Sequence, residues 1–175
     1  MTDGITWSEI TDRAAARELE HFACTTNHPR TPGGRKLPHP RQWEWDVQRY
    51  LRTASHWYRT GDVLLIGHDV NGAVAAAAHL MIDQGDALLE VFIAALAVAH
   101  THRDKGGAVA DETFRRIKAT AVAVARERGL PAAILTGKIH RNNRASQYLA
   151  LRHGQEPVGV PSEDYGLWCL HLALE

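Results

Sequence analysis

The feature that most constrains this chain is an almost unbroken apolar stretch over residues 87–99, with the sequence ALLEVFIAALAVA. A strand that is apolar at successive positions, and not only at alternate ones, must be covered on both faces, as in the centre of an α/β sheet. Its longest uninterrupted apolar run, Val91 to Ala99, is about half of what a bilayer span requires. The stretch therefore predicts a central strand with helices on either side of it.

The segment that follows supplies one of these covers. From about Gly107 to Arg128 apolar side chains recur at helical spacing, and Gly129 and Pro131 end the pattern. The apolar stripe consists of Ala110, Phe114, Ile117, Ala121 and Val124. A buried strand, a short loop and a long amphipathic helix thus follow one another.

The remaining segments predict a mixed α/β fold. The Asn71-Gly72 turn between residues 62–70 and 73–83 is typical of a β-hairpin. Further strands are expected over 5–10, 132–139, 156–160 and 165–174, and further helices over 12–22, 41–60 and 143–153. Strands that alternate in this way with helices predict an α/β sandwich built on a mixed sheet.

Length and composition favour one domain, spanning residues 1–175. A chain with 45% hydrophobic residues can bury one substantial core, and 20 basic residues balance 20 acidic ones, which excludes a global attraction to nucleic acid or anionic membranes. Cys24 and Cys169 form no disulfide framework or zinc-ligand pattern. The amino-terminal sequence MTDGITWSEITDR lacks a basic region followed by an apolar one. We expect a cytoplasmic protein with no membrane partner and no metal.

The loop between the apolar strand and the long helix predicts an anion site. Its sequence, VAHTHRDKGGA over residues 98–108, places glycines directly before the helix. Backbone N–H groups at a helix start are unpaired and lie at the positive end of the helix dipole, and glycine lets a phosphate approach the backbone. Neither GxGxxG nor GxxxxGK[ST] occurs, which argues against a dinucleotide fold and a P-loop.

This loop resembles that of the GNAT family of acyl-CoA-dependent N-acetyltransferases. The family carries Arg or Gln, two residues, Gly, one residue, and then Gly or Ala, and the matching residues here are Arg103, Asp104, Lys105, Gly106, Gly107 and Ala108. Val98 stands five residues before Arg103, as it often does in the family. Asn143, Ala145 and Gly154 repeat a second family spacing, so the resemblance covers residues 61–160.

The resemblance implies a fold and a reaction. The fold would be a three-layer one, with a mixed, mostly antiparallel sheet of about seven strands and helices on both faces. The reaction would transfer acetyl from acetyl-CoA to a primary amine of a small molecule or peptide by direct attack. The pyrophosphate would lie on the 103–108 loop and the pantetheine arm near Asn143, while backbone N–H groups near Leu96, Ala97 and Val98 would polarise the thioester carbonyl. The implied partners are acetyl-CoA and the amine acceptor, and a homodimer is allowed.

The chain departs from the family where a general acid is expected. Many relatives place a tyrosine four residues before the glycine that Gly154 matches, and this chain has Ala150 there. Tyr148 is the nearest tyrosine, although two residues on a helix turn a side chain by about 200°. Tyr148 is therefore the candidate acid, with core packing as the alternative role.

The usual base is also missing. Relatives often carry a carboxylate near the end of the apolar strand, and this chain has Ala94-Ala95 there. Glu90 shares its strand parity with Phe92 and would have a raised pKa if buried, so Glu90 is the candidate base. The alternatives are a solvent-facing Glu90 with water or a histidine as the base.

A basic loop over residues 28–41 lies on the expected acceptor side. No acidic residue occurs between His21 and Gln42, while Arg30, Arg35, Lys36 and Arg41 do. The loop either pairs with an anionic or nucleic-acid-bearing acceptor or simply connects two helices. Nucleic acid is otherwise not expected as a partner.

Two other functions stay open beside the N-acetyltransferase. Ala150 and Ala94-Ala95 are compatible with a non-catalytic acyl-CoA-binding domain. The Phe22-Ala-Cys24 sequence faintly resembles GNAT toxins that acetylate aminoacyl-tRNA.

Overall fold

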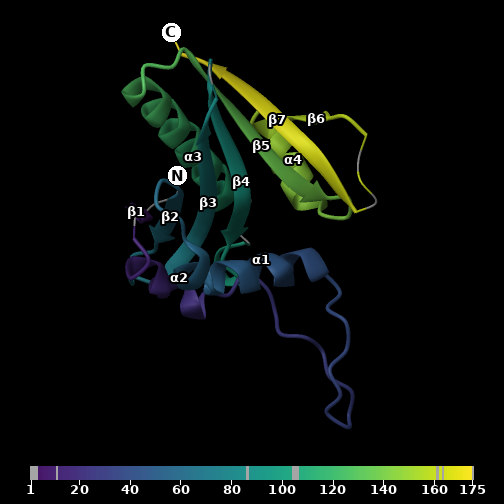
Figure 1. The fold of residues 1–175 in the computed structure, drawn as a ribbon. Helices are drawn as coiled ribbons and strands as arrows, with labels where there is room; N and C mark the ends of the chain where they lie inside the picture. The colour runs from purple at the N-terminus through teal and green to yellow at the C-terminus, as the bar shows by residue number, and fades with distance from the viewer. Residues whose placement is uncertain are drawn as a thin grey trace.

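One sheet organises the part of the chain that the computed structural model describes, residues 4–10, 12–85, 87–103, 107–160, 162 and 164–174 (Figure 1). Its strands are β1 (Thr6–Ile10), β2 (Val63–His68), β3 (Val74–Gln84), β4 (Leu89–Val98), β5 (Ala132–His140), β6 (Glu156–Val158) and β7 (Tyr165–Ala173). They lie in the order β1-β2-β3-β4-β5-β7-β6, and β4 with β5 is the parallel pair. The predicted mixed, mostly antiparallel sheet of about seven strands is confirmed.

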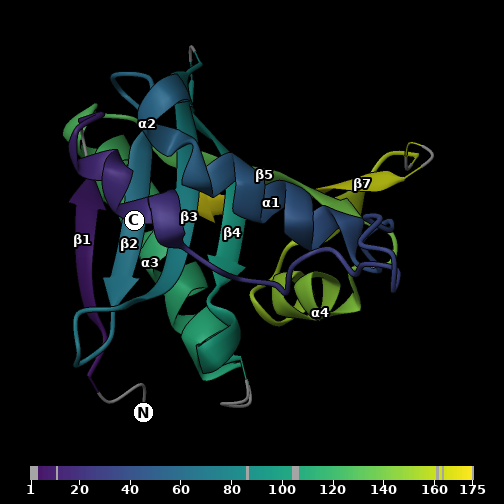
Figure 2. The same ribbon diagram turned by 90° about the horizontal axis from the view of Figure 1, so that it is seen from below.

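Helices cover both faces of this sheet, as predicted. They are η1 (Ala15–His21), α1 (Gln42–Arg52), α2 (Ala54–Trp57), η2 (His100–His102), α3 (Ala108–Glu127) and α4 (Arg144–Arg152). Figure 2 shows α1 in front of the sheet and α3 behind it. Within the described residues, no helix has the length and apolar character needed to cross a membrane.

The two faces of the sheet explain why its inner strands read as continuous apolar runs. On β2, Leu64 and Ile66 belong to the core beneath α1, α2 and η1. Val63 and Leu65 belong to the opposite core, where Ile117 of α3 packs. Because successive side chains of a strand point to opposite faces, burial on both sides requires apolar residues at every position.

Two helix predictions need correction. The segment expected as a helix from residue 12 to 22 is a 3-10 helix, although its start signal is right, since Asp12 Oδ1 accepts a hydrogen bond from the Ala15 N–H at 2.8 Å. The helix expected over 41–60 ends at Arg52. There the Thr53 hydroxyl donates to the Tyr50 carbonyl at 3.0 Å, and the Trp57 indole N–H donates to the same carbonyl at 2.9 Å. Side chains thus take an acceptor that a continuing helix would use.

The sheet opens where β4 leaves β5. The two strands pair only from Leu89 to Ile93 on the β4 side. On its other edge β4 pairs with β3, where His79 lies opposite Ala95 and Leu80 opposite Ile93, so Ala94 is an extra residue in a β-bulge. Beyond Ile93 the β5-facing edge of β4 has no strand partner among the described residues, and Figure 2 shows the two strands separating.

Candidate functional site

Two cavities meet at the opening between β4 and β5. The larger has a volume of about 810 Å³ and the smaller about 400 Å³. Six residues line both cavities, namely Trp43, Val47, Leu96, Asn143, Ser146 and Leu149. The shared residues come from α1, β4 and α4, so the unpaired edge of β4 lies on the boundary between two adjacent spaces.

The smaller cavity contains the described part of the predicted phosphate loop. Ala97, Val98, Arg103 and Gly107 line it. Gly107 is the N-cap of α3 with a φ of 81°, and no side chain of the described residues caps this helix start. Ala108 is the first residue of α3. The remaining loop residues predicted to bind, Asp104, Lys105 and Gly106, lie outside the described residues.

Two arginines line the smaller cavity, and each is paired with a carboxylate. Arg103 donates to Glu44 Oε1 at 2.8 Å and to the Val98 carbonyl at 3.3 Å. Arg152, at the end of α4, donates to Asp111 Oδ1 at 2.9 Å. Guanidinium groups beside an uncapped helix start form a site suited to a phosphate or pyrophosphate.

Asp111 joins α3 to α4 beside this cavity. Its Oδ1 accepts from Arg152 and lies 3.0 Å from His153 Nε2. Burial alone would raise the pKa of Asp111, but the hydrogen bonds from Arg152 and His153 outweigh burial and hold that pKa below its usual range. The link is therefore an ion pair at neutral pH.

Asn143 lies between the two cavities and caps α4. Its Oδ1 accepts a hydrogen bond from the Ser146 N–H at 3.2 Å. An N-cap uses the side-chain oxygen, so the amide nitrogen of Asn143 is not needed for the cap. The predicted pantetheine contact and the helix cap are thus compatible.

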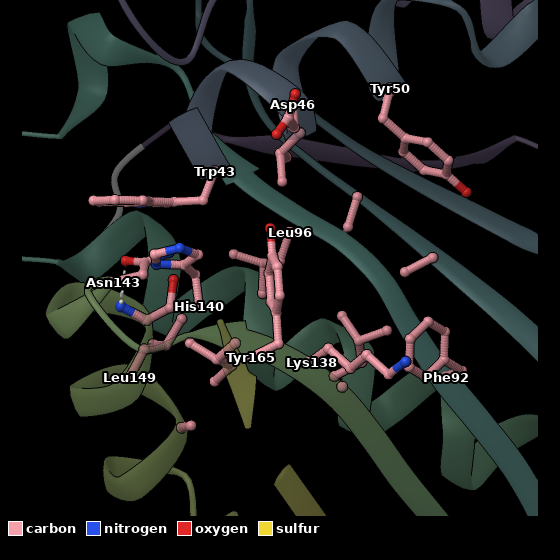
Figure 3. Close-up of a pocket in the computed structure, with 18 of the residues that line it drawn as sticks. Trp43, Asp46, Tyr50, Phe92, Leu96, Lys138, His140, Asn143, Leu149 and Tyr165 are labelled. Atoms are coloured by element: carbon pink, nitrogen blue, oxygen red, sulfur yellow. Dashed lines mark hydrogen bonds between the residues drawn. The ribbon is translucent and has the colours of Figure 1, made fainter. Parts of the chain in front are cut away.

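Aromatic rings surround the larger cavity (Figure 3), whose lining includes Trp43, Tyr50, Phe92, His140 and Tyr165. His140 stacks on Trp43 with a centroid separation of 4.6 Å and meets Tyr165 edge-on at 5.1 Å. The Asn142 N–H donates to His140 Nδ1 at 3.1 Å, so a neutral His140 carries its proton on Nε2. His140 is thereby a hydrogen-bond donor to the cavity.

Charged and phenolic groups complete the larger cavity. Asp46 and Arg49 of α1 and Lys138 of β5 line it. Tyr165 points into the cavity in Figure 3. Burial, reinforced by Asp46 and Asp164, raises the pKa of Tyr165, so its hydroxyl stays protonated at neutral pH.

A buried chain of polar side chains leads from the larger cavity into the core. The Tyr50 hydroxyl lies 2.7 Å from His79 Nδ1, and His79 Nε2 lies 3.2 Å from Asp62 Oδ2. Arg59 donates to the other oxygen, Asp62 Oδ1, at 3.0 Å. The sequence did not predict this group, because its members lie on α1, on β3 and before β2 with no motif spacing. The one available signal was a histidine within a continuous apolar strand.

The structure separates the two residues predicted for proton transfer. Tyr148 lines the smaller cavity with 61% of its surface exposed, while Ala150 lines the larger one. Glu90 is exposed near the start of β4 and lines neither cavity. The side chain of Glu90 lies on the same face of β4 as that of Phe92, but Glu90 is two residues further from the point where β4 and β5 separate. The structure thus brings Tyr148, and not Glu90, to the other predicted residues.

Cys24 also lies at the smaller cavity. Its backbone N–H donates to Gln48 Oε1 at 2.8 Å. Burial raises the pKa of the Cys24 thiol to about 11 despite the opposing charge of Arg103. A thiol that stays protonated is a poor nucleophile, so Cys24 is a structural residue here.

The basic loop forms an arm that extends away from the sheet (Figure 1). A bridge between Arg30 and Lys36 closes its tip. At its base the His28 ring meets Trp45 edge-on at 4.5 Å, and Lys36 Nζ lies 5.3 Å from the centroid of Trp45. Trp45 therefore anchors the arm, whereas Trp43 lines the cavities.

Comparisons with known proteins give matches at the level of structure. No family model matches the sequence, and no curated protein matches it. The spermidine/spermine N-acetyltransferase of Vibrio cholerae is 13% identical, and the match covers 97% of this chain and 94% of that one with a TM-score of 0.54. Nourseothricin acetyltransferase is 14% identical, with coverages of 97% and 99% and a TM-score of 0.58. A GNAT-family acetyltransferase of Streptococcus pneumoniae is 18% identical, with coverages of 96% and 99% and a TM-score of 0.53.

These matches extend over nearly the whole of each chain, so they concern the complete arrangement of elements and not one shared motif. Identities at this level establish a common fold and leave the reaction to be argued from the site. The mixed, mostly antiparallel seven-stranded sheet and the glycine at the start of α3 agree with the predicted architecture. The chain has the fold of the GNAT acetyltransferases.

Proposed function

We propose that the protein is an N-acetyltransferase that moves an acetyl group from acetyl-CoA to a primary amine. The observation that carries this proposal is the meeting of two unlike cavities at the unpaired edge of β4. One cavity has an arginine wall and an uncapped helix start, and the other is walled by aromatic rings. Such a pair suits a phosphorylated donor on one side and an organic acceptor on the other.

The residues of the smaller cavity fit the donor. The N–H groups of the first turn of α3, with Arg103 and Arg152, would hold the pyrophosphate. The amide nitrogen of Asn143 is available to the pantetheine arm. Trp43 lines both cavities, and its buried indole N–H has no hydrogen-bond partner among the described residues.

The edge of β4 would activate the thioester. Backbone N–H groups near Leu96, Ala97 and Val98 that face away from β3 have no strand partner on their other side in the part of the chain that the structure describes. A fixed N–H aimed at the carbonyl oxygen stabilises the negative charge that develops there during attack. This contribution needs no particular side chain, which makes the alanines of β4 compatible with catalysis.

Tyr148 is the proposed general acid toward the leaving thiolate. Its ring lines the cavity that would receive the donor, and its exposure lets the hydroxyl recover a proton from water. Ala150, which matches the family position for this role, carries no ionisable group. Glu90 has no place in the proposed chemistry because it lies outside both cavities.

The function is tested by incubating the protein with acetyl-CoA and a panel of primary amines. Release of free thiol that depends on the amine, together with an acetylated product in mass spectrometry, is the expected result. Tight CoA binding without turnover on any amine would favour a non-catalytic acyl-CoA-binding domain instead. Absence of CoA binding in calorimetry would overturn both functions.

An acceptor carried on RNA is the second candidate, and the basic arm is the observation that favours it. Arg30, Arg35 and Lys36 belong to an arm on the α1 side of the molecule, where α1 also lines the larger cavity. Phosphate contacts by such residues weaken steeply with salt. Faster acetylation of aminoacyl-tRNA than of the free aminoacyl ester, lost in a Arg30→Glu/Arg35→Glu double variant and at high salt, would support it. Growth arrest on expression is expected in that case.

A further inference from the structure

The hydrogen bonds that connect Tyr50, His79 and Asp62 all run in one direction, from the phenol to the carboxylate. Asp62 is only 4% exposed, and its carboxylate accepts a hydrogen bond from Arg59 at 3.0 Å, so it acts as an acceptor. His79, 1% exposed, therefore donates its Nε2–H to Asp62 and keeps Nδ1 as an acceptor. The Tyr50 hydroxyl donates to that nitrogen. The lone pairs of the phenol oxygen are left for a donor in the larger cavity.

This chain lies over the segment of β4 where acetyl transfer is proposed. His79 is opposite Ala95 in the β3–β4 ladder, so the two side chains point to the same face, beneath α1. Ala94, Ala95 and Leu96 line the larger cavity, as does Tyr50. The Tyr50 hydroxyl, bound to His79, is thus placed above the bulged part of β4.

The surroundings keep Tyr50 and His79 uncharged at neutral pH. Burial, with a smaller effect of Asp62, raises the pKa of Tyr50 to about 12. Burial lowers the pKa of His79, opposed by Asp62 and reinforced by Arg59. Trp57 of α2 packs against both rings, with centroids 4.2 Å from Tyr50 and 4.5 Å from His79. Asp62 and Arg59 are the charged groups that act on His79. The Tyr58 hydroxyl donates to the backbone carbonyls of Asp62 and Ile10, at 2.5 Å and 3.3 Å.

An amine acceptor poses a proton problem that the family's usual residues do not solve here. A primary alkyl amine is an ammonium at neutral pH, and its lone pair becomes available only after one proton leaves. Ala94 and Ala95 cannot accept that proton, and Glu90 lies outside the cavity. A buried phenol cannot accept it alone, because it would become an oxonium unless its own proton moves on at the same time.

We propose that Tyr50, His79 and Asp62 form a proton relay that deprotonates the acceptor ammonium. The ammonium N–H passes its proton to the Tyr50 oxygen while the phenol proton moves to His79 Nδ1, which leaves a free amine and an imidazolium paired with Asp62. The amine nitrogen then forms its bond to the acetyl carbon, the carbon–sulfur bond breaks, Tyr148 gives its proton to the thiolate, and the second nitrogen proton leaves to solvent. After product release the imidazolium returns its proton through Tyr50 to solvent. Tyr50 is the catalytic residue, and His79 and Asp62 are positioning residues.

The inference rests on the proposed acetyl transfer and is tested with Tyr50→Phe. This change removes the hydroxyl and keeps the ring that stacks on Trp57. Two acceptors of similar shape are compared, an alkyl amine that is protonated at neutral pH and a weakly basic amine that is not. For the alkyl amine kcat/KM should fall by about 10²-fold at neutral pH and recover as pH rises, because the free amine becomes abundant. For the weakly basic amine the loss should stay below about threefold.

Tyr58→Phe is the matched control. It also removes a buried tyrosine hydroxyl, but that hydroxyl binds the Asp62 backbone carbonyl and lies outside the relay. It should lower the melting temperature without distinguishing between the two amines. Asp62→Asn should reproduce the amine-dependent loss of Tyr50→Phe, because the imidazolium would lose its counter-charge.

The possible outcomes distinguish a failure of the proton relay from a failure of the proposed acetyl transfer. If the wild type acetylates amines and Tyr50→Phe loses the same factor on both acceptors, or nothing, the relay is wrong and the proposed function stands. If the wild type acetylates no amine, both are overturned. CoA affinity measured on each folded variant shows whether a loss of rate arises from donor binding instead.

Discussion

Arg103 Nη1 lies 2.8 Å from Glu44 Oε1, so the loop predicted to hold the cofactor is tied to the first turn of α1. Glu44 also pairs with Arg41 at 3.2 Å, and its second oxygen is buried without a partner among the described residues. A carboxylate thus lines the cavity that is proposed to receive an anionic ligand. Its charge opposes that ligand, even though its geometry orders the arginine.

Glu44→Gln should therefore raise the affinity for CoA by roughly threefold at low salt, and less at high salt, because a screened negative charge is removed. Calorimetric titration of CoA at the two salt concentrations measures the effect. Asp46→Asn removes a carboxylate from the other cavity and should leave CoA affinity unchanged. A weaker affinity in Glu44→Gln would mean that the ion pair positions Arg103 and that this role dominates.

Gly107→Ala should weaken CoA binding. At a φ of 81° a Cβ is strained, and the added atom would lie 3.3 Å from Arg152 Nη2, in the wall of the smaller cavity. Gly129→Ala is the control, because Gly129 ends the same helix at a φ of 66° with no atom within 4 Å of the added Cβ. Both variants should lose about 1 kcal/mol of stability, and only Gly107→Ala should lose affinity. Equal affinities would remove the start of α3 from the binding site.

The two roles of Asn143 can be separated by a pair of variants. Asp is as good an N-cap as Asn, so Asn143→Asp should keep the melting temperature while its lost amide donor weakens CoA binding. Asn143→Ala should in addition cost about 1 kcal/mol of stability through the lost bond to the Ser146 N–H. Wild-type affinity in Asn143→Asp would leave the residue a helix cap alone.

Tyr148→Phe should leave CoA affinity and stability nearly unchanged, since the ring is retained and mostly exposed. If the hydroxyl protonates the thiolate, turnover should fall by about 10²-fold. Steady-state kinetics with a fixed amine measure this loss. An unchanged turnover would assign the proton of the leaving group to water.

His79 should make the protein less stable in mild acid. Burial holds its folded-state pKa below 6.5, although Asp62 opposes the shift. The unfolded chain binds a proton near pH 6.5 and the folded chain does not, so the free energy of unfolding falls as pH drops below that value until the folded pKa is reached. In His79→Gln this slope should decrease by up to about 1.4 kcal/mol per pH unit. Denaturant unfolding between neutral pH and about pH 5 measures the slope, and an identical slope would contradict the assignment.

The helices and strands of this fold could be predicted wherever burial imposes a regular spacing of apolar residues along the sequence. The continuous apolar run of β4 and the stripe of α3 have long patterns, and Gly72 at the β2–β3 turn has a φ of 78°, which its Asn-Gly signal anticipates. The type and the length of a helix were harder to predict from the sequence. The break at Thr53 depends on two side chains that reach the Tyr50 carbonyl, and sequence spacing does not reveal that competition.

The candidate site likewise has a part that could be predicted from the sequence and a part that could not. The phosphate loop is local, so its residues could be named from a contiguous motif. The relay is not local, since Tyr50, Asp62 and His79 come together only when α1 packs on the β2–β3 side of the sheet. Glu90 was predicted from strand parity, which gives the face of the sheet on which a side chain lies. Parity does not give the distance along the strand to the opening, and Glu90 lies outside both cavities.

The ion pair between Asp111 and Arg152 has a mechanical consequence for the opening of the sheet. β4 and β5 are paired from Leu89 to Ile93 on the β4 side, and the two strands separate beyond this short ladder. The ion pair links α3, which packs on β3, β4 and β5, to the end of α4 beside the smaller cavity. Salt weakens a partly exposed charge pair of this kind, so ionic strength should loosen the link between α3 and α4 at the smaller cavity.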